Sequence, residues 1–353
     1  MTAQQMAIGD RLVGQGAPVF VIAEAGVNHD GELVRALELV DAAARAGADA
    51  VKFQTFEPDA LVTAAAPLAP YQRDSETTAA GQRELLERLC LSAADFARLA
   101  EHCASRGLLF LSTPFDADSA ALLVELGVPA FKVGSGELTN IPFLRDLSSR
   151  GLPLLLSTGM ATLDEVSHAL DAIQDAGCKV VLLHCTSSYP APPEEANLRA
   201  IDTLRAAFGV PVGYSDHSLG FAVSLAAVAR DACVVERHLT LDRHLAGPDH
   251  AMSLEPDELG ELIRQIRSLE AMLGDGCKRP QPSEGELLLA ARRSIVAARP
   301  LAAGEVLSAA ALAVKRPGGG MPPSSLESLV GARLARPLAA DEQLTSAHLE
   351  PRP

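Results

Sequence analysis

The sequence predicts an α/β protein, built as a (β/α)8 TIM barrel with a small second domain at its C-terminal end. Eight short apolar runs alternate with longer segments of helical periodicity up to about residue 273. The composition changes after Gly274, and 353 residues are enough for about two domains of ordinary size. We therefore place the barrel in residues 1–274, a linker in 275–291 and the second domain in 292–353.

The eight apolar runs are the predicted barrel strands. They are rich in Val, Ile, Leu and Phe, as is typical of parallel strands buried on both faces. The runs are 19–25, 49–55, 108–113, 130–135, 152–158, 179–185, 210–215 and 233–239. Between them lie segments with apolar residues at three- and four-residue steps, which predict helices. Examples are 32–47, 163–177 and 219–232.

An open, doubly wound sheet is the alternative to a closed barrel. Such a sheet normally carries a GxGxxG turn after its first strand, where the phosphates of a dinucleotide bind. The turn here is AEAGVNHDG. Because this turn lacks the glycine pattern and the strand–helix units number eight, we favour the barrel.

The C-terminal segment has a different character. Residues 275–286, DGCKRPQPSEGE, are rich in proline, glycine and charge and predict a surface linker. Short β-like pieces follow from Arg292. The stretch ARPLAAGEVLSAAAL (298–312) is echoed by ARPLAADEQLTSAHL (335–349), which predicts two similar units of strand followed by helical turn.

Composition excludes several classes of partner. The formal charge is −15, with 45 acidic against 30 basic side chains, whereas a nucleic-acid-binding protein needs a basic surface. No signal sequence and no run of 18 apolar residues is present, so we predict a cytoplasmic protein without a membrane span. The six cysteines are widely spaced without a CxxC pair, and we expect them to be free thiols.

Every predicted strand ends in a polar residue. In a barrel of this kind the active site lies at the C-terminal ends of the strands, so these residues are site candidates. Polar strand ends also arise simply because they approach solvent. The candidates are Glu24, Lys52, Gln54, Thr113, Lys132, Ser135, Ser157, His184, Thr186, Ser215, Asp216, His217, Glu236 and His238.

His217 and His238 follow the seventh and eighth strands, which are neighbours in the barrel. Taken on their own, they are interpreted first as hydrogen-bonded structural histidines. The alternative is that both imidazoles bind one divalent cation, with Glu24 or Asp249 nearby as an oxygen ligand or hydrogen-bond partner.

Lys52 and Lys132 lie in VKFQT and FKVGS, between apolar neighbours. Two ammonium groups at one barrel mouth, beside Ser135 and Ser157, would form a local cationic pocket for a phosphate and a carboxylate. A buried strand lysine also suits Schiff-base chemistry, and the residues alone do not separate the two interpretations.

Together, the motifs resemble one enzyme family. They are AEAGVNHDG, VKFQT, STPFD, FKVGSGE, LSTGM, HCTSSYPAP, GYSDHSLG, ERHLTLDR, AGPDH and KRPGGG. In this order they are similar to the bacterial N-acylneuraminate (sialic acid) synthases, including the legionaminic and pseudaminic acid synthases. The resemblance covers nearly the whole chain, and its C-terminal part is similar to the antifreeze-like (SAF-type) domain of those enzymes.

The resemblance implies a reaction. Phosphoenolpyruvate would condense with a 2-acetamido hexose and water to give a nine-carbon 2-keto acid and phosphate. A catalytic divalent metal is implied, Mn²⁺ in the first place, with Mg²⁺ or Co²⁺ as alternatives. A domain-swapped homodimer is implied as well, in which the antifreeze-like domain covers the partner's barrel.

The resemblance also implies roles for the candidate residues. His217 and His238 would bind the metal and, with Glu24, form the catalytic group. The phosphoenolpyruvate ligands would be Lys52, Gln54, Thr113, Lys132, Ser135 and Ser157. The sugar ligands would be Tyr189, Ser215, Glu236, Asp249 and, across the dimer, Arg316.

Two departures from the family pattern bear on the sugar. Ser187 stands where some sialic acid synthases carry Asn, and residues 58–84 do not match the Asn-containing sialic acid version. We therefore keep two substrates, N-acetylmannosamine and 2,4-diacetamido-2,4,6-trideoxymannose. The alternative functions are a Schiff-base aldolase or lyase of nonulosonic acids and a non-catalytic sugar- or phosphate-binding protein.

Overall fold

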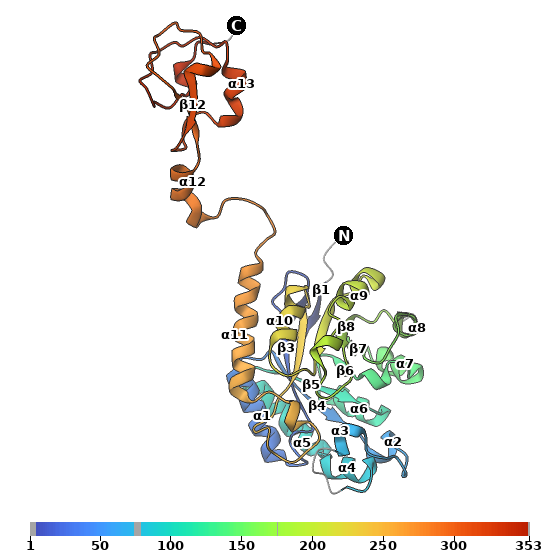
Figure 1. Ribbon diagram of the computed structural model, residues 1–353. Coiled ribbons are helices and arrows are strands. Elements are labelled where there is room, and N and C mark those ends of the chain that lie inside the picture. Colours follow the sequence, from blue (N-terminus) through green and yellow to red (C-terminus); the bar gives the residue numbers. More distant parts are fainter. Residues whose placement is uncertain (1–4, 74–78, 175, 352–353) are drawn as a thin grey trace. The chain divides into compact units, whose positions relative to one another are not determined.

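The structure is a computed structural model that describes residues 5–73, 79–174 and 176–351. The chain divides into two compact units, residues 1–274 and 275–353. Figure 1 shows the elements of each unit. No helix in the described ranges is long and apolar enough to cross a membrane.

The first unit contains the predicted eight-stranded parallel sheet. Its hydrogen-bonded order is β5-β4-β3-β10-β9-β8-β7-β6, so the first and last barrel strands, β3 and β10, pair with each other. β5 and β6, at the two ends of this order, lie in contact, and the sheet is a nearly closed barrel. The strands are β3 (Phe20–Gly26), β4 (Ala50–Thr55), β5 (Leu109–Pro114), β6 (Phe131–Val133), β7 (Leu154–Ser157), β8 (Val180–Cys185), β9 (Val212–Asp216) and β10 (Val234–His238).

Helices follow the strands, as predicted. Those of the first unit are α1 (Leu33–Ala46), α2 (Pro58–Leu61), α3 (Pro70–Arg73), α4 (Gln82–Leu89), α5 (Ala93–Ser105), α6 (Ala117–Glu125), α7 (Ile141–Ser149), α8 (Leu163–Gln174), α9 (Ala200–Phe208), α10 (Ala222–Ala229) and α11 (Pro256–Leu273). Local chemistry sets their ends. Ser92 and Asp95 form a capping box at the start of α5, and α1 ends at Gly47 with φ 87°, a left-handed conformation that favours glycine.

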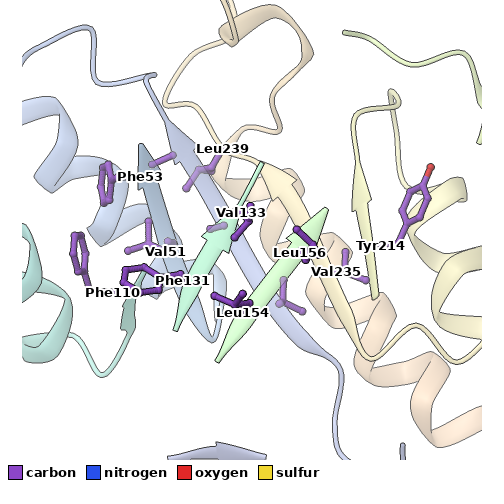
Figure 2. Packing of buried hydrophobic residues seen from close by; sticks show 14 of the residues in the cluster. Val51, Phe53, Phe110, Phe131, Val133, Leu154, Leu156, Tyr214, Val235 and Leu239 are labelled. Carbon is purple, nitrogen blue, oxygen red and sulfur yellow. The ribbon is translucent and has the colours of Figure 1, made fainter. Parts of the chain in front are cut away.

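Two apolar layers hold the barrel together. Alternate strand residues point outward and pack under the helices; Figure 2 shows Val51, Phe53, Phe131 and Leu156 in this layer. The intervening residues fill the barrel interior, for example Ile22 and Leu155. The hairpin of β1 (Gln5–Ile8) and β2 (Arg11–Gly14) adds Met6, Ile8 and Val13 to this interior layer. Inward-pointing strand residues that lie C-terminal to this interior apolar layer are therefore free to form a polar site.

The second unit is built on an internal repeat. Leu301 and Leu338, equivalent positions of the two echoed stretches, exchange backbone hydrogen bonds with each other at 2.9 and 3.0 Å. Equivalent 3-10 turns follow at η5 (Ala309–Ala311) and η7 (Ser346–His348). The unit's other elements are η4 (Pro282–Glu284), α12 (Gly285–Ala291), β11 (Ser294–Ala297), β12 (Leu312–Lys315), η6 (Pro323–Ser325) and α13 (Leu326–Leu329). The two echoed stretches thus form a pair that shares one core and has equivalent turns, but they meet through isolated β-bridges, and the regular strands β11 and β12 lie at or outside the ends of the first stretch.

The predicted linker is not irregular throughout. Its last seven residues form α12, and the Gly318 amide donates to the carbonyl of Leu289 on this helix. This part of 275–291 therefore packs with the C-terminal unit. All six cysteines are free thiols.

Candidate functional site

A cavity of about 680 Å³ lies at the C-terminal ends of the barrel strands. That volume is within the usual range for small-molecule sites. It is lined by thirteen of the fourteen residues to which the family resemblance assigns a role; these are Glu24, Lys52, Gln54, Thr113, Lys132, Ser135, Ser157, Tyr189, Ser215, His217, Glu236, His238 and Asp249. The exception, Arg316, lies in the second unit and is exposed.

Strand alternation brings these side chains into the cavity. In β4, Lys52 and Gln54 line the cavity, while Val51 and Phe53 point outward into the layer of Figure 2. The outward-pointing apolar residues are buried under helices. This packing fixes the orientation of each strand, so that the polar residues between them point into the barrel. Nine of the thirteen residues therefore lie on strands, whereas Ser135, Tyr189, His217 and Asp249 lie in the segments that follow strands.

The floor of the cavity carries two ammonium groups and two carboxylates. Lys52 Nζ lies 2.6 Å from Glu24 Oε2 and donates to Thr113 Oγ1 at 2.9 Å. Lys132 Nζ lies 3.5 Å from Glu236 Oε1. All four charged side chains are at most 4% exposed. Their charges balance, which makes burial of the cluster tolerable.

Glu236 lies between the two lysines. Its Oε2 is 3.9 Å from Lys52 Nζ, and its Oε1 accepts from Ser215 Oγ at 2.9 Å. Burial alone would raise the pKa of Glu236, but Lys132, Lys52 and the Ser215 hydrogen bond outweigh burial and lower it. Glu236 is therefore an anion. The resemblance assigns it to the sugar, whereas its contacts here are with the lysines and Ser215.

The pKa of Glu24 is shifted in the opposite direction. Burial raises its pKa to about 7, although the Lys52 ammonium group partly offsets that effect. A carboxyl with a pKa near 7 can both accept and donate a proton at neutral pH. Gln54 Nε2 donates to Glu24 Oε1 at 3.3 Å and orients the group.

Hydroxyl groups collect beside Lys132. Ser157 Oγ and Ser187 Oγ are buried without a hydrogen-bond partner, although buried polar atoms normally have one. Ser135 Oγ accepts from the Gly159 amide at 3.1 Å. A Cβ atom at Gly159 would collide with Ser187, Ser135 and Cys185, so only glycine leaves these groups room. Unused donors beside an ammonium group suit a phosphate.

The two histidines lie next to each other in the cavity wall. Their ring centroids are 5.5 Å apart, and both side chains are buried. His217 Nδ1 lies 2.8 Å from the Thr186 carbonyl oxygen, which can only accept, so Nδ1 carries the proton and Nε2 keeps its lone pair. Burial lowers the pKa of His217 and lowers that of His238 well below its usual value. Both imidazoles are therefore neutral near pH 7, as metal ligands must be.

The pair could supply two ligands to a divalent metal. His238 Nδ1 is buried without a hydrogen-bond partner, 3.7 Å from Asp249 Oδ2. Within the described ranges, no group of three or more His, Cys, Asp and Glu side chains is arranged around one ion. The protein would thus supply two imidazoles, and oxygen atoms of water or substrate would complete the coordination.

Polar groups also line the part of the cavity next to the two histidines. Gly26 has φ 53°, and a Cβ atom there would lie 3.3–3.5 Å from polar atoms of Glu24, Gln54 and Asp249. Tyr189 packs on His217 with ring centroids 4.4 Å apart. Burial raises the pKa of Asp249 to about 6. These groups surround the space next to the two histidines.

The remaining wall is largely apolar and was not foreseen in detail. It is formed by the excursion between β4 and α5, together with side chains that follow β3 and β5. Its members are Val27, Leu61, Val62, Ala69, Gln72, Gln82, Leu86, Leu89 and Phe115. This confirms that part of the divergent segment 58–84 lines the cavity; residues 74–78 of that segment lie outside the described residues.

Sequence reasoning missed Cys185 and Gly159 as members of the site. Cys185 ends β8, and its Sγ lies 3.2 Å from Ser135 Oγ. The position of Cys185 at the end of a predicted strand was the sequence feature that could have identified it. His184, named as a strand-end candidate, instead places Nε2 3.0 Å from the Ala196 carbonyl and packs on Tyr214, away from the cavity lining.

Known proteins are similar to this chain in sequence and fold. The model of the NeuB family matches residues 39–278, and that of the SAF domain matches residues 292–350. The N,N'-diacetyllegionaminic acid synthase of Legionella pneumophila is 45% identical over 96% of both chains. That of Campylobacter jejuni is 43% identical over 91% of this chain and 97% of its own.

A solved structure supports the family match over most of the chain. The N-acetylneuraminic acid (sialic acid) synthetase of Leptospira borgpetersenii superposes with a TM-score of 0.72 at 37% identity, covering 81% of this chain and 95% of that one. Extended similarity at this level of identity establishes the family. The chain belongs to the NeuB family and carries a SAF domain at its C-terminal end.

Proposed function

We propose that this protein is a nonulosonic acid synthase that joins phosphoenolpyruvate to an N-acylated amino sugar and releases phosphate. The observation that carries the proposal is one cavity in which two ammonium groups and unpartnered hydroxyls lie beside a pair of neutral imidazoles. The ammonium groups and hydroxyls would bind the phosphate and carboxylate of phosphoenolpyruvate. The imidazoles would bind the metal that polarises the sugar aldehyde. Membership of the NeuB family supports the same reaction class.

The lysine end would bind phosphoenolpyruvate. Lys132, Ser135 and Ser157 would hold the phosphate, and Lys52 with Thr113 the carboxylate. All of these groups except Ser135, which lies two residues after β6, are fixed on strands before substrate binds, so they would stabilise developing charge without reorganisation. Glu236 lies 3.9 Å from Lys52 Nζ and 3.5 Å from Lys132 Nζ and would keep the two lysines aligned.

The histidine end would bind the sugar. A divalent ion held by His217 and His238, Mn²⁺ with Mg²⁺ or Co²⁺ as alternatives, would supply Lewis-acid polarisation of the open-chain sugar aldehyde. Tyr189, Ser215 and Asp249 would position the sugar oxygens around it.

The bonds made and broken then balance. The C3 atom of phosphoenolpyruvate forms a carbon–carbon bond to the sugar C1, whose aldehyde oxygen becomes a hydroxyl. Positive character develops at C2 of the former phosphoenolpyruvate. Water adds at C2, and cleavage of the C2–O bond expels inorganic phosphate to leave the 2-keto acid. Glu24, with a pKa near 7, would take the proton from water and return it to a nascent hydroxyl. No Schiff base to Lys52 or Lys132 is needed.

We further propose 2,4-diacetamido-2,4,6-trideoxymannose as the preferred sugar over N-acetylmannosamine. The supporting observation is the apolar wall of Leu61, Val62 and Leu86, which suits a C6 methyl and an acetamido methyl better than a hydroxymethyl. Among the described residues that line the cavity, the lysines are Lys52 and Lys132, both ion-paired at the floor, so this part of the wall offers no positive charge to a 6-phosphate.

We also propose a cytoplasmic homodimer. Phosphoenolpyruvate is an intracellular metabolite, which supports the location. The exposed Arg316 in the SAF domain is available to a partner's cavity, where it would contact the N-acyl group of the sugar.

Phosphate release tests the proposal. Purified protein with phosphoenolpyruvate and Mn²⁺ is given the diacetamido sugar, N-acetylmannosamine or N-acetylmannosamine 6-phosphate in parallel. We expect release with the diacetamido sugar at a kcat/KM about tenfold above that for N-acetylmannosamine, and loss of release with EDTA. Chelator-resistant activity with borohydride trapping by pyruvate would identify a Schiff-base lyase instead, and a lack of turnover with every sugar would leave a binding protein.

A further inference from the structure

Asp216 and Arg237 form a buried ion pair in the barrel wall, on the face opposite to the cavity. Arg237 Nη1 lies 2.6 Å from Asp216 Oδ2, and each residue is 1% exposed. The two are direct partners in the register between β9 and β10. The pair therefore ties the ends of these two strands together.

Each member is the central residue of a site-bearing tripeptide. Asp216 stands between Ser215 and His217, and Arg237 stands between Glu236 and His238. Because successive strand residues point to opposite faces, an outward ion pair leaves its four neighbours to line the cavity. The site residues of both strands thus flank one contact.

The same carboxylate closes the turn from Asp216 to Ser218, which has His217 at its centre. Asp216 Oδ1 accepts from the amide and the hydroxyl of Ser218 at 2.9 and 2.7 Å. Asp216 Oδ2 also accepts from Ser224 Oγ on α10. Arg237 Nη2 donates to the Ser218 carbonyl at 2.8 Å, so the arginine holds both ends of the turn.

His217 lies at the centre of this turn. Its carbonyl accepts from the Ala191 amide at 2.9 Å, and its ring is oriented by Thr186. The backbone that carries the ring is therefore constrained from β8, β9 and β10. His238, one residue beyond Arg237, shares the last of these strands.

We propose that the Asp216–Arg237 pair is a positioning clamp that sets the separation of the two imidazoles. Neither residue lines the cavity; the pair fixes the ends of β9 and β10 and the turn at Ser218. Groups behind a ligating histidine commonly change metal affinity by about 10- to 100-fold when altered. The metal-affinity readout rests on the proposed function, whereas the strand-fixing role does not.

Two conservative variants test the clamp in the full-length protein. Arg237→Lys keeps the charge but removes the forked contact with Asp216 and Ser218. Asp216→Asn keeps the side-chain shape and an acceptor for Ser218 but removes the ion pair. The matched control is Arg267→Lys, because Arg267 pairs with Asp49 at 3.1 Å next to the opposite end of β4.

Three measurements are made on each protein. They are hydrogen–deuterium exchange of peptides covering 212–219 and 234–239, the Mn²⁺ dissociation constant by electron paramagnetic resonance, and kcat with KM for phosphoenolpyruvate. We expect both clamp variants to unfold cooperatively, to exchange at least about tenfold faster in these peptides, and to bind Mn²⁺ about tenfold more weakly. We also expect kcat to fall more than KM rises, while the control matches the wild type.

The proposal is overturned if folded clamp variants match the wild type within twofold in both exchange and Mn²⁺ affinity. It is also overturned if both variants lose cooperative unfolding, because the pair would then be a general structural element. A wild-type protein that binds no Mn²⁺ would refute the proposed metal site, and the exchange comparison would still decide the clamp.

Discussion

Lys52 Nζ lies 2.6 Å from Glu24 Oε2, whereas Lys132 Nζ lies 3.5 Å from Glu236 Oε1. The two lysines of the cavity floor are thus unequally neutralised. Lys132 makes one further contact, to the Val133 carbonyl at 3.4 Å. Burial lowers the pKa of Lys132, so binding an anion there relieves an incompletely compensated cation.

This inequality predicts that Lys132 contributes more than Thr113 to phosphoenolpyruvate binding. Lys132→Met should raise KM for phosphoenolpyruvate about 10- to 100-fold, since a hydrogen bond to a charged group contributes about 1.5–3 kcal/mol. Thr113→Val should raise it less, because Lys52 keeps Glu24 as a partner. Initial phosphate-release rates at varied phosphoenolpyruvate decide the order, and a larger effect of Thr113→Val would contradict the assignment of the phosphate to Lys132.

The imidazole pair predicts a separate phenotype. His217→Ala should lower Mn²⁺ affinity at least about 100-fold and abolish phosphate release, because one of two protein ligands is removed. Isothermal titration with Mn²⁺ measures this directly. His184→Ala is the control, since that ring bonds to Ala196 and lies outside the cavity lining. Equal Mn²⁺ affinity of the two variants would remove His217 from the metal site.

The strands and the cavity residues were predictable from sequence for the same reason. Residues such as Lys52 alternate with Val51 and Phe53, so the pattern that identifies a buried strand also identifies which side chain enters the barrel. The pairing of Lys52 with Glu24 was not predictable, since strand ends give proximity without side-chain direction. Asp216 was singled out as a strand end, but its outward contact with Arg237 depends on the register between two strands.

The apolar wall escaped prediction for a different reason. α2 and α4 have four and eight residues, too short for helical periodicity to be clear. Leu61 and Leu86 lie on separate helices, and only the fold places both on the cavity. The sequence could therefore show that this segment differs from sialic acid synthases but not what kind of surface it presents.

That wall predicts how sugar preference can be changed. Leu86→Gln should lower kcat/KM for the diacetamido sugar about tenfold, because a polar amide would then face the C6 methyl. The rate with N-acetylmannosamine should fall less, so the ratio between the sugars narrows. Val124→Gln is the control, an exposed apolar residue on α6. If the two sugars were affected equally, the wall would not contact the end of the sugar where they differ.

The raised pKa of Glu24 predicts a pH-dependent stability difference. Its folded-state pKa of about 7 exceeds the ordinary value of 4.5, so the folded protein holds a proton that the unfolded chain releases between these values. The stability that comes from the neutral carboxyl is present below pH 4.5 and is lost as pH rises toward 7. Glu24→Gln, which stays neutral, should therefore gain in unfolding free energy relative to the wild type between pH 5 and 8.

Urea unfolding at four pH values measures that difference. Glu101→Gln, on the exposed side of α5, is the control for removing a carboxylate and should follow the wild type. A difference between Glu24→Gln and the wild type that stays constant, or shrinks as pH rises, would show that Glu24 is ionised throughout.

Arg316 predicts complementation between subunits. If it serves the partner's cavity, a dimer of one His217→Ala chain and one Arg316→Ala chain contains a site with an intact metal pair and an intact arginine; the other site carries both changes. Arg316→Ala alone should raise KM for the sugar about tenfold through loss of a charge-assisted contact. The two inactive or weakened proteins, mixed under conditions that exchange subunits and assayed at low sugar, should regain activity that neither has alone. Activity no greater than the average of the two parents would place Arg316 in the cavity of its own chain or outside any site, because only a contribution across the dimer rebuilds one complete centre from two defective chains.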